Sequence, residues 1–340
     1  MKSEFDFIEK IRRHTQPKPA HIGIGDDCAV IRKDAKTDLV ITADLLVEDV
    51  DFRLRWTTPE FVGHKALAIS LSDVAAMGAK PVWAMLSIGI PEKIWKTNFV
   101  DEFYKGWFRL AKKFDVALVG GDVSRTPDKI VIDSIVAGET KKGKAVLRSG
   151  AKAGDLIFVT GNLGGAAAGL QLLEKGERYE KNSKTFEQKL LLRQLKPQPQ
   201  TEIGKILGEK NLATAMIDLS DGLSSDLTHL CRESKIGAKI FADKIPFDEN
   251  LKKFFTRRRA EAKKQSGEKQ ISEELSFALN GGEDFELLFT ANPKKKFQLE
   301  KALENFAFSG IGKVTANIEI IELISADKTA ILPSEGFRHF

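Results

Sequence analysis

The sequence contains little cysteine and no long apolar run. Its 340 residues include two cysteines, Cys28 and Cys231, which are too few for a disulfide framework and show no metal-ligand spacing. The longest apolar runs, such as residues 82–91, fall well short of the ~20 residues that cross a bilayer. The first residues mix acids and bases and lack the apolar core of a signal peptide. We therefore expect no secreted, membrane or zinc-ribbon protein, and we predict a cytoplasmic location.

The chain also lacks a general excess of positive charge. Its formal net charge is +5, but residues 252–269 alone contain eight Lys or Arg and two Glu. The rest of the chain is therefore close to neutral, and the basicity belongs to one insertion. We predict a solvated surface loop there, with a partner contact as the alternative, and we expect no nucleic-acid partner.

Length and patterning predict two domains of an α/β (α+β) fold. Compact apolar runs predict strands at 38–44, 82–91, 116–121, 129–138, 156–161 and 286–290. Helical spacing of apolar residues predicts helices at 61–79, 97–114, 164–176, 184–195, 224–234 and 295–306. A turn-rich segment, GAKAGD, begins at Gly150. We therefore expect mixed α/β domains at 1–148 and 149–340, the second carrying the basic insertion.

Acidic residues recur where apolar or glycine-rich segments end. They are Asp26, Asp27, Asp44, Asp122, Asp218, Asp221, Glu283 and Asp284. Asp73 interrupts an otherwise apolar helical stretch, where an unpaired charge is costly. A single acid after a strand is usually a turn or cap residue, and that reading stays open for Asp26 and Asp284. Several such acids in one chain predict instead a cluster that cations must neutralise.

The available ligands favour a hard cation. The five histidines are scattered and form no paired metal motif. Carboxylate and hydroxyl oxygens suit Mg²⁺ or Mn²⁺ better than Zn²⁺. Because Mg²⁺ usually shares its coordination with phosphate oxygens, the cluster indicates a nucleotide or phosphate-ester substrate.

Two further features could contact phosphate. The glycine-rich segment 161–169 follows a strand and opens a helix, so it could bind an anion or simply allow close helix packing. It matches neither a Walker A loop nor a dinucleotide fingerprint. Arg148 could clamp a phosphate bidentately, or it could form a salt bridge at the domain boundary.

The ordered motifs resemble those of thiamine-monophosphate kinases. They are GIGDDCAVI, TADLLVEDVDF, KALAISLSDVAAMGAKP, LVGGDVSR, LRSGAKAGD, IDLSDGLSSDL and LNGGEDFELLFT. The resemblance extends from about Glu4 to the terminal GFRHF. It implies a member of the ATP-binding synthetase superfamily that also includes aminoimidazole ribonucleotide synthetase, selenophosphate synthetase and a hydrogenase maturation protein. The implied reaction transfers the γ-phosphoryl group of ATP to thiamine phosphate with several Mg²⁺ ions, in a homodimer paired through the N-terminal domains.

The resemblance also assigns roles by position. It implies metal binding at Asp27, Thr42, Ala43, Asp44, Asp73, Asp122, Asp218 and Asp221. It implies nucleotide binding at Gly121, Asp122, Arg148 and Ser220, and substrate binding at Asp51, Glu283 and Phe337. A phosphate monoester with a second pKa near ~6 is already nucleophilic at neutral pH. We therefore predict direct in-line transfer, with no residue acting as general acid or base.

Some positions depart from the family pattern. Asp51 stands where the family commonly has His, and an acid there suits a cationic ring better than an incoming phosphate. Ala43 replaces a frequent hydroxyl residue, so a metal contact there must come from its carbonyl oxygen. The alternatives are another ATP-using synthetase of the superfamily and a non-catalytic nucleotide-binding protein that binds RNA through the basic insertion. The segment before GIGDD lacks cysteine and the chain ends Arg-His-Phe, which disfavours selenophosphate synthetase and the hydrogenase maturation protein.

Overall fold

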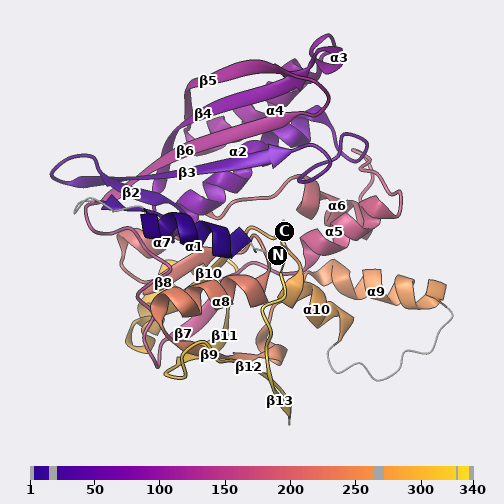
Figure 1. Ribbon diagram of the computed structural model, residues 1–340. Coiled ribbons are helices and arrows are strands. Elements are labelled where there is room, and N and C mark those ends of the chain that lie inside the picture. Colours follow the sequence, from indigo (N-terminus) through magenta and orange to yellow (C-terminus); the bar gives the residue numbers. More distant parts are fainter. Residues whose placement is uncertain (1–3, 15–20, 263–271, 327, 337–340) are drawn as a thin grey trace.

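A computed structural model describes residues 4–14, 21–262, 272–326 and 328–336 and contains two β-sheets (Figure 1). The first half of the chain forms the upper sheet in that view, and the second half forms the lower one. Helices surround both sheets, so the predicted mixed α/β fold is confirmed. No described helix is long and apolar enough to cross a membrane.

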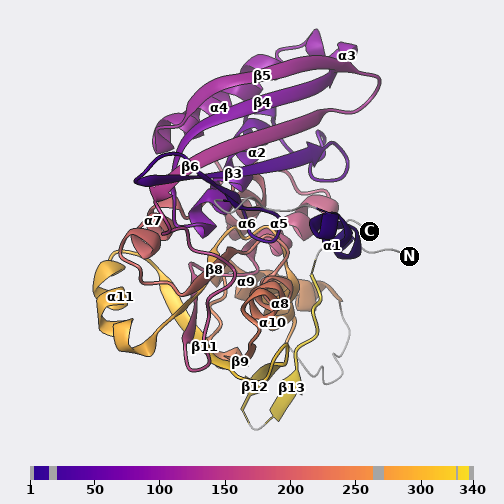
Figure 2. The same ribbon diagram turned by 60° about the vertical axis from the view of Figure 1, so that its left-hand side comes forward.

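The N-terminal sheet has six strands in the order β1-β2-β3-β6-β4-β5. The strands are β1 (His21–Ile22), β2 (Ala29–Arg32), β3 (Thr37–Val47), β4 (Lys80–Pro91), β5 (Ala117–Thr126) and β6 (Val131–Lys141). All neighbours are antiparallel except β4 and β5. The helices of this half are α2 (Pro59–Ala76), the short α3 (Glu92–Trp95) and α4 (Phe99–Phe114). Figure 2 shows α2 and α4 on one side of the sheet.

Helix α2 is the central helix of the molecule. The Thr58 side chain caps its start by accepting a hydrogen bond from the Phe61 N–H, and Pro59 occupies the first turn. The helix is apolar on nearly all sides, which allows it to pack against α4, the N-terminal sheet, and β8 and α7 of the second half. Gly78, at φ +66°, reverses the chain just after the helix ends. Asp73 is therefore held between the two halves of the chain.

The C-terminal sheet has seven strands in the order β13-β12-β9-β11-β7-β10-β8. They are β7 (Leu156–Thr160), β8 (Ala215–Asp218), β9 (Gly237–Phe241), β10 (Leu287–Ala291), β11 (Phe308–Thr315), β12 (Ile321–Ser325) and β13 (Lys328–Ile331). The helices are α5 (Gly165–Glu174), α6 (Phe186–Leu195), α7 (Thr201–Glu209), α8 (Leu223–Ser234), α9 (Glu249–Ala262), α10 (Glu273–Asn280) and α11 (Lys296–Ala302), with short 3₁₀ turns at Ala242–Lys244 and Pro293–Lys295. The N-terminal helix α1 (Glu4–His14) contacts this half through an ion pair between Arg12 and Glu233 of α8.

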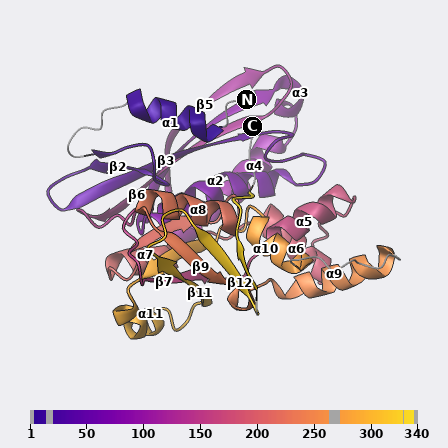
Figure 3. The same cartoon turned by 60° about the horizontal axis from the view of Figure 1, so that its bottom comes forward.

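The structure of the basic insertion differs from the loop predicted from the sequence. Residues 252–262 belong to helix α9 rather than to a loop, and the remainder, to residue 269, lies outside the described residues. Phe254 and Phe255 are buried against α5 and α6, because an apolar pair one turn into the helix faces that core. Figure 3 shows α9 at the edge of the molecule beside these helices.

Candidate active site

Three acidic residues from distant parts of the sequence meet beneath the N-terminal sheet. Asp27 comes from the loop before β2, Asp73 from α2, and Asp218 from the end of β8. One carboxylate oxygen of each lies within 4.8 Å of the others. Such a group of hard oxygen ligands fits a divalent cation. Among the described residues, no group hydrogen-bonds the buried Oδ2 of Asp27, so this oxygen is available to such an ion.

Hydroxyl groups orient the carboxylates of the cluster. Ser72 donates to Asp218 Oδ2 at 2.7 Å, and Thr42 donates to Asp73 Oδ2 at 2.5 Å. Ser70 donates to Asp44 Oδ2 at 2.6 Å, which holds Asp44 beside the cluster on the same face of β3 as Thr42. Each bond occupies one oxygen, so the carboxylates are held in fixed directions.

The cluster has more negative charge than the chain neutralises. Burial, followed by the charge of Asp27, raises the pKa of Asp218 to about 8. Burial and the charges of Asp44 and Asp218 raise the pKa of Asp73 well above its usual value. Burial raises the pKa of Asp44 to about 6, against the hydrogen bond from Ser70. Bound cations would relieve this repulsion.

Arg148 supplies a positive charge at the cluster. Its Nη2 lies 2.5 Å from Asp27 Oδ1, and its backbone N–H donates to Asp26 Oδ1 at 2.6 Å. The salt-bridge interpretation of Arg148 therefore holds in this structure. The bidentate phosphate clamp stays a prediction.

A pocket of 580 Å³ opens beside the cluster. Its lining includes Asp44, Asp51, Ser220, Asp221 and Glu283. Its walls come from the segment 50–57, α2, α5 and the loop 281–285, so both halves of the chain build it. Pockets of this size hold small organic ligands.

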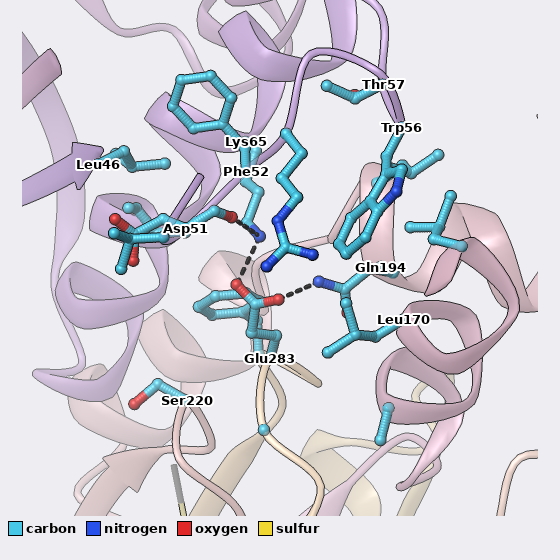
Figure 4. A pocket seen from close by; sticks show the side chains of 18 of the residues that line it. Leu46, Asp51, Phe52, Trp56, Thr57, Lys65, Leu170, Gln194, Ser220 and Glu283 are labelled. Carbon is cyan, nitrogen blue, oxygen red and sulfur yellow. Dashed lines mark hydrogen bonds and ion pairs between the residues drawn. The ribbon is translucent and has the colours of Figure 1, made fainter. Parts of the chain in front are cut away.

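Asp51 and Glu283, two of the three predicted substrate positions, lie within this pocket (Figure 4). Asp51 Oδ2 accepts the Val47 N–H at 2.7 Å, which fixes the Asp51 carboxylate on the turn after β3. The Glu283 carboxylate forms an ion pair with Lys65 and accepts a hydrogen bond from Gln194. Gly336 also lines the pocket, whereas the predicted stacking residue Phe337 lies outside the described residues.

The remaining predicted residues do not join the cluster within one chain. The Ala43 side chain faces the opposite side of β3 from Thr42 and Asp44, as strand alternation requires, and the predicted contact through its carbonyl oxygen stays a prediction. Gly121 and Asp122 lie on the edge strand β5 and are exposed. The register places Gly121 three strands from Asp44, which is about 14 Å at the usual strand spacing.

The glycine-rich segment 161–169 has a structural role. Asp284 accepts hydrogen bonds from the N–H groups of Gly164 at 2.6 Å and Ala166 at 3.2 Å, at the start of α5. The protein's own carboxylate therefore occupies the place of an anion. The sequence left open an anion site and close helix packing, and it did not predict this capping of α5 by Asp284.

Other residues at the site were not predicted from the sequence. Ser70 and Ser72 have a weak signal, because they precede Asp73 in an apolar helical stretch. Lys65 lies in the same motif, one turn before them, and Gln194 lies at the end of α6. Trp56 lines the pocket, and the Arg53 guanidinium carbon lies 4.2 Å from the centre of its ring.

The chain was compared with known proteins. Residues 25–140 match the family described as AIR synthase related protein, N-terminal domain, and residues 152–322 match the corresponding C-terminal domain. A thiamine-monophosphate kinase of Buchnera aphidicola subsp. Schizaphis graminum is 38% identical over 344 residues, which cover 99% of both proteins. The chain belongs to the thiamine-monophosphate kinase family. The family resemblance inferred from the sequence is thereby confirmed.

Two further comparisons agree with this assignment. The thiamine-monophosphate kinase of Bacillus subtilis strain 168 is 34% identical over 99% of both proteins. The solved structure of AaThiL complexed with AMPPCP and TMP matches with a TM-score of 0.82 and 32% identity, covering 99% of this chain and 97% of AaThiL. The hydrogenase maturation protein HypE in complex with ATP is 15% identical with a TM-score of 0.67, so it shares the fold alone.

Proposed function

We propose that this protein transfers the γ-phosphoryl group of ATP to thiamine phosphate, giving thiamine diphosphate and ADP. The observation that carries the proposal is that Asp44, Asp51, Asp221 and Glu283 all line one pocket. A pocket that joins a metal-type carboxylate cluster to acidic walls suits an acceptor with a phosphate at one end and a cationic ring at the other. The family members that match over the full length are named for this reaction.

We propose that Mg²⁺ ions bind at the cluster. Asp27, Asp73 and Asp218 would hold the first ion, with Asp44 and Asp221 close enough to the pocket to share others. The free Oδ2 of Asp27 and the raised pKa of Asp218 both fit a site built for a cation. Bound Mg²⁺ would neutralise the charge of the two phosphate groups as they approach.

The chain contributes positioning rather than proton transfer. No histidine lines the pocket among the described residues, and the acceptor phosphate needs no base because it is already nucleophilic. One acceptor oxygen forms a bond to the γ-phosphorus while the bond from that phosphorus to the bridging oxygen of ADP breaks. The hydroxyls of Thr42, Ser70 and Ser72 keep the carboxylates oriented during this exchange.

We propose a homodimer paired through the N-terminal sheets. Strand β5 is a ten-residue edge strand that is exposed almost throughout, and Leu45 and Met85 expose apolar surface on the sheet face away from α2. Such an edge and face are usually covered by another chain. Pairing would also bring Asp122 of one subunit toward the site of the other, which accounts for its distance from Asp44 within one chain. A cytoplasmic location stays a prediction from the sequence.

The test is product analysis by phosphorus NMR of the purified protein with ATP, Mg²⁺ and thiamine phosphate. Thiamine diphosphate and ADP in equal amounts would establish the reaction and make Asp51 a tolerated variation. ADP without thiamine diphosphate, or no turnover at all, would refute the proposed acceptor. Omitting Mg²⁺ and adding EDTA is the matched control and should abolish both products.

A further inference from the structure

One buried cation ties together the two substrate positions of the pocket. Lys65 lies on α2 with its side chain 8% exposed, whereas the Glu283 side chain is 31% exposed and lines the pocket. Lys65 Nζ lies 2.5 Å from Glu283 Oε1 and donates to the Asp51 carbonyl oxygen at 3.2 Å. The turn after β3 and the loop 281–285 therefore meet at a single ammonium group (Figure 4).

Glu283 is held from several sides. Its second oxygen, Oε2, accepts from Gln194 Nε2 of α6, and its backbone N–H donates to the Ser220 carbonyl oxygen at 2.8 Å. The residue adopts φ +65°, a left-handed conformation that a side chain other than glycine rarely takes. Neighbouring contacts must impose such a conformation, and it directs the carboxylate into the pocket.

Among the described residues, the Lys65 ammonium forms an ion pair with one carboxylate, that of Glu283, and donates to one backbone carbonyl. A buried ammonium without a partner is costly, so Lys65 requires Glu283 to be ionised and close. An ion pair with an ammonium also restricts the carboxylate more firmly than the hydrogen bond from the uncharged Gln194 amide does.

We propose that Lys65 is the positioning residue of the acceptor site: it fixes the Glu283 carboxylate and the Asp51 turn in the geometry that binds the thiamine moiety. This inference rests on the proposed function and deepens it. Lys65 acts through Glu283 rather than on the transferred phosphoryl group. Its loss should therefore weaken binding of thiamine phosphate and leave binding of ATP unchanged.

The test is a double-mutant cycle of Lys65→Met, Glu283→Gln and the combined variant, read as KM for each substrate. Lys65→Met should raise the KM for thiamine phosphate about 10- to 100-fold, the range expected for a lost hydrogen bond between charged groups. The KM for ATP should stay constant. The combined variant should be no worse than Glu283→Gln, because Lys65 has nothing left to position. Lys65→Arg keeps the charge and should restore part of the affinity.

Controls separate positioning from folding. Lys205→Met removes an exposed lysine paired with Glu209 on α7 and should change neither KM. If Lys65→Met fails to fold, Gln194→Met removes the other donor to the same carboxylate and should give a smaller rise in the same KM. Multiplying effects in the combined variant, or equal rises in both KM values, would overturn the inference.

The outcomes also distinguish the two proposals. If the wild type makes no thiamine diphosphate, the proposed function fails, and the same cycle is then measured as calorimetric affinity for thiamine phosphate. Loss of that affinity in Lys65→Met alone would support the positioning role without the reaction. Unchanged affinity in Lys65→Met would refute it.

Discussion

The carboxylate cluster makes the stability of the metal-free protein depend on pH, and Asp218 is one of the buried acids responsible. Burial raises its pKa from 3.8 to about 8, so ionising it in the folded protein is unfavourable. Because the folded pKa exceeds the unfolded one, the associated loss of stability is absent below about pH 4 and grows as the pH rises toward 8. At 1.36 kcal/mol per pH unit, the loss grows to roughly 4 kcal/mol at pH 7.

Asp218→Asn removes this charge and keeps the shape of the side chain, and its amide oxygen can still accept from Ser72. In EDTA we therefore expect the variant to be more stable than the wild type at pH 7 and nearly equal to it at pH 4. In Mg²⁺ the order should reverse, because the wild type gains a bound ion that the variant holds weakly.

The assay is thermal unfolding of both proteins in EDTA and in Mg²⁺, from pH 4 to pH 8. Taking the difference between variant and wild type cancels the titrating groups that do not interact with Asp218, and it includes the response of Asp73, whose pKa the Asp218 charge raises. A difference in EDTA that does not depend on pH would refute the electrostatic reasoning. An equal Mg²⁺ stabilisation of both proteins would refute the assignment of Asp218 as a ligand.

Three further predictions address the dimer, the glycine-rich segment and the basic helix. Asp44→Asn and Asp122→Asn should each lower turnover by orders of magnitude without unfolding the protein. If Asp122 acts across the dimer, mixing the two variants should restore about a quarter of the activity, since half of the chains then form hybrids with one intact site. No recovery would mean that both residues serve a site within the same chain. Asp284→Asn should lower the free energy of unfolding by about 1–2 kcal/mol, through the weakened cap of α5, with no change in KM for ATP, and a raised KM would return the segment to phosphate binding. Arg257→Ala, which breaks the ion pair between α9 and Glu187, should leave turnover unchanged in a steady-state assay, and a large loss would give the basic insertion a catalytic role.

Much of the fold was readable from the sequence because local patterns were strong. The compact apolar run at 38–44 lies within β3, and the helix predicted at 61–79 matches α2 except for residues 77–79, which follow its end. The basic insertion was misread because its charges hid Phe254 and Phe255, whose burial depends on contacts with distant helices. A hydropathy pattern cannot distinguish two buried rings among eight cations from two exposed ones.

The sequence predicts the kind of site but not all of the residues that form it. Asp27, Asp73 and Asp218 stand out because each is an acid in an apolar or glycine-rich setting, and they do meet. Lys65 and Gln194 could not be singled out, since a lysine and a glutamine on helices are usually solvated. They share the partner Glu283 only because the fold brings both helices to the loop 281–285.

That loop carries neighbouring side chains in different directions. Glu283 reaches the pocket, Asp284 caps α5, and Glu286 binds Thr160 and the guanidinium of Arg193. The floor of the pocket and the helix that forms one of its walls are thus anchored to the same short stretch of backbone. Glu283 and helix α5 therefore move together, and this side of the pocket is rigid. Any adjustment to an arriving ligand must come from the opposite wall beyond the Asp51 turn, in the segment 52–57.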